Sequence, residues 1–151
     1  MKTIQSFTVD HDKLLPGLYL SRVDGDAMTF DLRTRRPNGG EYMDDMTMHS
    51  VEHLFATFVR NGPLGEKVLY FGPMGCQTGF YLITRTLPLE TVKKEVFRVL
   101  QEILLYEGEM PGGTRKECGN YRNLSMEAGK KECRRYLNEL MKRKIDFNYE
   151  V

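Results

Sequence analysis

Two pairs of short strand-like segments, each pair joined by a tight turn, constrain the fold of this chain more than any other feature. Residues 18–23 and 28–32 flank the turn Asp24-Gly25-Asp26, and the second of these segments alternates apolar with polar side chains. Residues 68–71 and 80–87 flank the glycine-rich loop GPMGCQTG in the same way. Each pair reads as a hairpin, so we expect an antiparallel sheet.

Three further segments repeat apolar side chains every three or four residues, which predicts amphipathic helices. The first covers residues 51–59, with Asp45 or Thr47 as its N-cap. The others cover residues 92–104 and about 125–142. Each segment is long enough to lay one apolar face on a sheet.

Residues 4–9 also read as a short strand. Hairpins with helices inserted between them, without strict alternation of strand and helix, favour the α+β class: an antiparallel β-sheet packed against helices. At 151 residues the chain is the size of one compact domain, spanning residues 1–151.

The charge balance argues against a polyanionic partner. Lys and Arg number 22 and Asp and Glu number 21, so neither nucleic acid nor an acidic membrane surface is favoured, and a small polar ligand fits better. No segment approaches the roughly 18 apolar residues of a membrane span, and the first residues lack a secretory signal. The 3 cysteines form a poor disulfide framework, which fits a reducing compartment; we expect a cytoplasmic protein.

The segment HSVEH places three chemically active side chains on the first predicted helix. His49 and His53 are one helical turn apart, so their imidazoles can converge on one metal ion. Glu52 points almost the same way, and a carboxylate beside a ligand can stay outside the coordination shell and move protons. The pattern therefore predicts a catalytic metal site.

A third ligand is needed, and the sequence offers the three cysteines and His11. Cys133 lies on the apolar face of the last helix and reads as core. Cys118, in the loop ECGNY, fits either a ligand or a free thiol, and the presence of HSVEH favours the ligand. A His₂Cys set with an open fourth position suits Fe(II), Zn or Co.

Three other residues give weaker signals. Cys76 follows Gly75 in a turn where its sulfur can approach a ligand, and a small side chain filling a tight turn explains it equally well. His11 alone is more often structural, and Arg33 on the polar face of a strand is more often solvated. The local sequence around each of these three residues does not assign it a role.

Five blocks of the chain resemble the S-ribosylhomocysteine lyase family, also called LuxS or autoinducer-2 synthase. They are SFTVDH, FDLRTRRPN, HSVEHLFATF, GPMGCQTGFYLI and KECGNY, in the family's order and at compatible spacing. The resemblance covers nearly the whole chain. It departs from the family at Tyr70, where many members have Asp, and at Gln77, where many have Arg.

The resemblance implies a metal-dependent carbon–sulfur lyase that splits S-ribosylhomocysteine into homocysteine and 4,5-dihydroxy-2,3-pentanedione, the autoinducer-2 precursor of quorum sensing. It implies Fe(2+) in the cell, with Zn or Co as substitutes, and a homodimer with its sites at the interface. The resemblance implies that the metal ligands are His49, His53 and Cys118. It implies that Cys76 and Glu52 are the acid/base pair. The implied substrate-binding residues are Ser6, His11 and Arg33.

Two other functions share part of this pattern. An HxxEH-type metallopeptidase has the two histidines and the glutamate, but such enzymes take a downstream Glu as third ligand and are much longer chains. A non-catalytic metal-binding protein would close the fourth position with another side chain, such as Cys76.

Overall fold

The computed structural model describes residues 1–149 and contains one antiparallel sheet. Its strands are β1 (Gly17–Asp24), β2 (Ala27–Arg33), β3 (Val68–Pro73) and β4 (Gly79–Thr84). They lie in the order β1-β2-β4-β3, so β1 and β3 form the two edges. The predicted α+β class and both hairpins are confirmed.

The first hairpin turns at a glycine in the left-handed region. Gly25 has φ +61° in the connection between Asp24 and Ala27, a conformation that costs a residue with a β-carbon about 1 kcal/mol. In the second hairpin, β4 ends at Thr84, before the predicted end at residue 87. Just past Thr84, the side chains of Arg85 and Thr86 bond to Asp26 of the first turn, at 2.9 and 3.2 Å, and the backbone N of Arg85 donates to the carbonyl of Lys67 at 2.8 Å.

The three predicted helices are confirmed as α1 (Asp45–Arg60), α2 (Leu89–Leu105) and α3 (Met126–Met141). The carboxylate of Asp44 caps α1 by accepting from the backbone N of Thr47 at 2.8 Å, so the N-cap is one residue before the predicted Asp45. Ser125 caps α3 in the same way. None of the helices in residues 1–149 is both long and apolar enough to cross a membrane.

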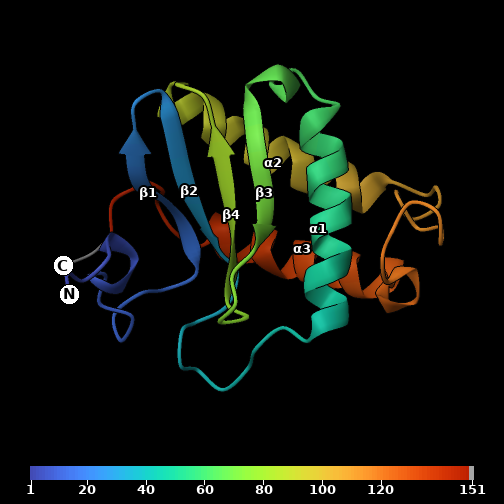
Figure 1. Cartoon of the computed structure of the whole chain (residues 1–151), viewed down its shortest axis with the longest axis horizontal. Helices are drawn as coiled ribbons and strands as arrows, with labels where there is room; N and C mark the ends of the chain where they lie inside the picture. The colour runs from blue at the N-terminus through green and yellow to red at the C-terminus, as the bar shows by residue number, and fades with distance from the viewer. Residues whose placement is uncertain (150–151) are drawn as a thin grey trace.

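The helices cover one face of the sheet. In Figure 1, α2 and α3 lie behind the strands and α1 lies beside β3. Phe30 of β2, Leu82 of β4, Leu54 of α1 and Val96 of α2 are fully buried between these layers. Each large apolar side chain buried in this way contributes about 1.5–3 kcal/mol, so the core holds α1 firmly against the sheet.

The predicted strand at residues 4–9 is wrong. The segment instead contains a short 3₁₀ helix, η1 (Gln5–Phe7), and Phe7 is 74% exposed. The hydroxyl of Thr8 donates to the carbonyl of Gln5 at 2.6 Å, and such local side-chain bonds compete with pairing in a sheet. Gln5 donates to the carbonyl of Ser21 on β1 at 3.1 Å, which places the segment beside the β1 edge.

Candidate metal centre

Two successive turns of α1 and a distant loop bring three ligand atoms together. One imidazole nitrogen each from His49 and His53 and the sulfur of Cys118 all lie within 4.8 Å of one another. The two imidazole rings have centroids 4.7 Å apart and are nearly perpendicular, at 89°. The helical spacing thus produces the convergence that the sequence predicts.

Backbone carbonyls orient both histidines. Nδ1 of His49 lies 3.0 Å from the carbonyl oxygen of Asn123, and Nδ1 of His53 lies 2.8 Å from that of Pro111. A carbonyl only accepts, so each Nδ1 carries the proton and each Nε2 keeps a free lone pair. Metal-binding histidines commonly have such an outer hydrogen bond.

The donor set fits a tetrahedral divalent metal. Sγ of Cys118 lies 3.4 Å from Nε2 of His49. Bond lengths of about 2.0–2.1 Å to nitrogen and 2.3 Å to sulfur, at a tetrahedral angle, place the two atoms about 3.5 Å apart. Among residues 1–149, the candidate metal group consists of these three residues and leaves a fourth position open.

The loop between α2 and α3 shapes the centre from the other side. Cys118 donates its backbone N–H to Thr114 at 3.0 Å, so the thiol projects from a turn. Gly112 has φ +65°, and a β-carbon there would lie 3.0 Å from Nδ1 of His53. Only glycine can adopt this positive φ and also leave room for the His53 ring without strain.

Cys76 is held in the loop between β3 and β4, at the same end of the molecule as the start of α1 (Figure 1). Gln77 adopts φ +66°, and its carbonyl accepts from the backbone N of Met43, just before α1, at 3.1 Å. The sulfur of Cys76 lies 3.0 Å from the hydroxyl of Thr78 and is exposed to solvent. The loop is therefore tied to α1 while its thiol stays accessible.

Arg33 reaches this thiol from a buried ion pair. Its Nη1 lies 3.8 Å from Sγ of Cys76 and donates to Thr78 at 2.9 Å. Its Nη2 donates to Asp31 at 2.6 Å, and the two side chains are only 4% and 1% exposed. Burial alone would lower the pKa of Arg33, but attraction and hydrogen bonds from Asp31 outweigh it and the pKa is raised. The expectation from the strand pattern alone, a solvated Arg33, is wrong.

The remaining predicted residues lie apart from one another. Glu52 is half-buried on α1, on the face that carries His49 and His53. Ser6 lies in η1, and His11 follows in the same N-terminal segment with its Nδ1 2.8 Å from the carbonyl of Val9. That segment adjoins the β1 edge, whereas α1 packs on β3 at the opposite edge. Within one chain, the structure does not bring Ser6 and His11 to the metal centre.

Comparison with known proteins decides the family. The model of the S-ribosylhomocysteinase (LuxS) family matches residues 4–146. An S-ribosylhomocysteine lyase of Clostridium beijerinckii is 41% identical over 93% of this chain and 92% of its own length. One from Finegoldia magna is 44% identical over 91% of each chain. The chain belongs to the LuxS family.

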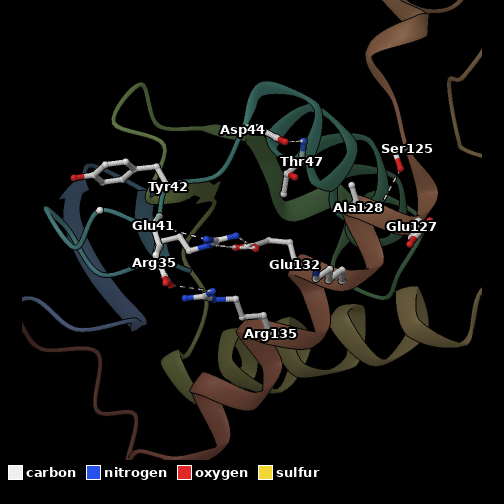
Figure 2. A pocket seen from close by; sticks show the side chains of 12 residues that line it. Arg35, Glu41, Tyr42, Asp44, Thr47, Ser125, Glu127, Ala128, Glu132 and Arg135 are labelled. Atoms are coloured by element: carbon white, nitrogen blue, oxygen red, sulfur yellow. Dashed lines mark hydrogen bonds and ion pairs between the residues drawn. The ribbon is translucent and has the colours of Figure 1, made fainter.

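A separate hollow in this LuxS-family chain lies apart from the converging ligand atoms. A cavity of about 820 Å³ lies between the start of α1 and α3 (Figure 2), and none of His49, Glu52, His53, Cys76 and Cys118 lines it. Several of its polar groups have partners: Arg35 pairs with Glu132 at 2.6 Å, and Asp44 and Ser125 cap their helices. Nε of Arg135, by contrast, is buried there without a hydrogen-bond partner. The candidate metal centre is therefore identified by the converging nitrogen and sulfur atoms of His49, His53 and Cys118, and not by the size of a cavity.

Sequence reasoning missed several residues that shape the candidate site of this LuxS-family chain. Asp31 stands two positions before Arg33, so strand alternation puts both side chains on one face of the sheet. Opposite charges at this spacing could have predicted the ion pair. Gly112 and the carbonyls of Pro111 and Asn123 gave no signal. Their roles depend on where a loop folds back on α1.

Proposed function

We propose that the chain is a metal-dependent S-ribosylhomocysteine lyase that releases homocysteine and 4,5-dihydroxy-2,3-pentanedione. The observation that carries the proposal is the convergence of His49, His53 and Cys118 in a LuxS-family chain. The relatives named S-ribosylhomocysteine lyase align over more than nine-tenths of their length. Residues 1–151 would form one lyase domain acting in the cytoplasm.

The metal would be held by Nε2 of His49, Nε2 of His53 and Sγ of Cys118. We expect Fe(2+) in the cell, with Zn or Co able to replace it. When bound, the ion supplies a Lewis acid that polarises the sugar carbonyl. The carbonyls of Asn123 and Pro111 support this assignment because they hold both Nε2 lone pairs toward the ion.

Cys76 would move the first protons. Its thiolate removes the proton from C2 of the open-chain sugar and returns it to C1, so the carbonyl moves from C1 to C2. The guanidinium of Arg33 lies 3.8 Å from the sulfur, and the hydroxyl of Thr78 bonds to both side chains, which fixes the position of the thiol.

Glu52 would perform the later transfers. Its carboxylate moves the carbonyl on to C3 and then removes the proton from C4. The electron pair of that C–H bond forms the C4–C5 double bond, the C5–S bond breaks, and homocysteine leaves as its thiolate. The enol that remains takes up a proton at C5 and loses its hydroxyl proton at C4, which gives the 2,3-dione. The position of Glu52, within one turn of both histidines, supports this role.

A homodimer would complete the substrate site with Ser6, His11 and Arg33. Ser6 and His11 lie beside the β1 edge, across the sheet from α1, so they reach a metal centre most simply on a second subunit. Edge strand β3 also exposes two large apolar side chains, Leu69 and Tyr70, which a partner would cover. These two observations support the proposal of a site at the subunit interface.

The alternatives predict different behaviour. The family match disfavours an HxxEH-type metallopeptidase, because the chain aligns with lyases over nearly its whole length. A non-catalytic metal protein would close the fourth position, and Cys76 is not part of the converging group found in residues 1–149. Optical spectra of the Co(II) form, with and without substrate, distinguish an open position from a closed one.

The decisive experiment is release of free thiol from S-ribosylhomocysteine, with metal analysis of anaerobically purified protein. Glu52→Gln and Cys76→Ala should keep the metal and release almost no thiol. Glu90→Gln, an exposed carboxylate on α2, and Cys133→Ala, a buried thiol, are matched controls that should stay active. Full activity in Glu52→Gln or Cys76→Ala would contradict the role given to that residue.

A further inference from the structure

A tyrosine near the end of the chain contacts the ion pair that supports Cys76. The hydroxyl of Tyr149 donates to Oδ2 of Asp31 at 2.8 Å. The same carboxylate accepts from Nη2 and Nε of Arg33, at 2.6 and 3.1 Å. Asp31 therefore joins Tyr149 on one side to Arg33 on the other.

One guanidinium nitrogen of Arg33 faces the loop between β3 and β4, which carries Cys76. Asp31 occupies Nε and Nη2, and Nη1 faces Thr78 and Cys76. A guanidinium is planar, so fixing two of its nitrogens also fixes the direction of the third. Whatever holds the carboxylate of Asp31 in place thus aims Nη1 at the sulfur.

The C-terminal segment is anchored so that Tyr149 meets Asp31. The backbone N of Leu20 donates to the carbonyl of Phe147 at 2.8 Å, and Phe147 is buried with its ring edge toward Phe30. The ring of Tyr149 stacks on Tyr19, with centroids 4.9 Å apart. Tyr19 is the partner of Asp31 in the β1–β2 register, so the stack lies directly beside the carboxylate.

We propose that Tyr149 is a positioning residue for Cys76, acting through Asp31 and Arg33. The inference rests on the proposed function, in which Cys76 moves protons. The match to the family model ends at residue 146, so Tyr149 lies outside the matched region.

Two physical effects give Tyr149 this role. Its hydroxyl offsets part of the negative charge of Asp31, so more of the positive charge of Arg33 acts on the sulfur. Its ring also shields the ion pair from water, which would otherwise screen Arg33. Loss of either effect destabilises the thiolate and slows its reactions.

Tyr149 stays protonated and so remains a donor. Burial, then the charge of Asp31 and the hydrogen bond to it, raise the pKa of Tyr149 above its ordinary value. The titratable groups whose charges interact with Asp31 or Arg33 are Cys76, Tyr81, Tyr136 and Tyr149. Burial raises the pKa of Tyr81 and Tyr136 as well, so the phenols stay neutral near pH 7.

The test is the rate of alkylation of Cys76 by iodoacetamide from pH 6 to 9 in the full-length, zinc-loaded protein. Tyr149→Phe keeps the stacked ring and removes the hydroxyl, and should slow alkylation at pH 7 by about 3-fold. Tyr149→Ala also admits water and should slow it by about 10-fold. In both, the profile should move to higher pH. An unchanged profile in Tyr149→Phe would overturn the proposal.

Three controls separate positioning from a structural effect. Cys76→Ser sets the background of the labelling. Tyr106→Phe removes a hydroxyl that donates to the backbone carbonyl of Glu109, and should leave the profile unchanged. In an Arg33→Lys background, Tyr149→Phe should have no further effect, because the coupling runs through Arg33; additive effects would overturn the proposal.

The alkylation test of Tyr149 can fail or succeed independently of the thiol-release test of the lyase activity. Alkylation needs no substrate, so it reports on Tyr149 even if the chain releases no thiol from S-ribosylhomocysteine. With substrate, Tyr149→Phe should lower kcat more than it changes KM, because Tyr149 acts on the proton-moving group, while Arg33 keeps its ion pair with Asp31 and so keeps its place in the substrate site. A change in KM alone would contradict the assigned role.

Discussion

Sγ of Cys118 lies 3.4 Å from Nε2 of His49, although the two residues are 69 positions apart in the chain. The contact depends on α1 being fixed against β3 and on the loop after α2 folding back over it. In the proposed centre, the two histidines are brought together by one helix, whereas Cys118 reaches them only through the tertiary fold.

Removing the sulfur should abolish tight metal binding. In Cys118→Ala we expect a loss of affinity greater than the roughly 10- to 100-fold that follows loss of an outer-shell partner. Competition with a chromophoric chelator measures it. Cys133→Ala is the matched control, because Cys133 is 1% exposed in the core and should keep full metal content. Equal affinities in the two variants would remove Cys118 from the ligand set.

A methyl group at Gly112 should loosen the centre without touching a ligand. In Gly112→Ala, the new carbon would sit 3.0 Å from Nδ1 of His53, and φ +65° would add about 1 kcal/mol of strain. We expect about 10-fold weaker metal binding, measured by the same competition. Gly25→Ala has a similar φ of +61° with open space around it, so it should lose stability and keep its metal affinity.

The three cysteines should react with iodoacetamide at pH 8 in a fixed order. Cys76 is exposed and reacts first, whereas burial and then the charge of Glu132 raise the pKa of Cys133 to about 12, so its thiolate is scarce. We expect Cys118 to react only after a chelator removes the metal, and Cys133 only after denaturation. Peptide mapping by mass spectrometry reads the sites, and labelling of Cys118 in the metal-loaded protein would count against its coordination.

The ion pair in the cavity of Figure 2 should matter for stability. Arg35 donates to Glu132 at 2.6 Å, and the two side chains are 15% and 3% exposed. Glu132→Gln leaves a largely buried guanidinium without its counter-charge, which should lower the free energy of unfolding by about 3 kcal/mol in urea titration. Asp26→Asn breaks the solvated pair with Arg85 and should cost less than about 1 kcal/mol. Equal costs would show that burial does not govern the pair.

The elements of the fold were largely readable from the chain. Turn residues predicted both hairpins, alternation predicted β2, and two apolar runs predicted β3 and β4. Apolar spacing predicted the helices to within a few residues. The exception, residues 4–9, has a strand-like composition, but the hydroxyl of Thr8 bonds locally and the segment does not pair with a sheet edge. Local patterns cannot report whether a partner strand is available.

The sequence by itself determined that His49, Glu52 and His53 share one face of a helix, because helical periodicity is a local property. Tertiary structure decided which cysteine approaches them, which carbonyls orient the imidazoles, and that Arg33 is buried against Asp31 rather than solvated. It also brought Tyr149 to Asp31. These contacts join residues far apart in the chain, and they depend on how the loops and the C-terminal segment pack against the sheet and α1.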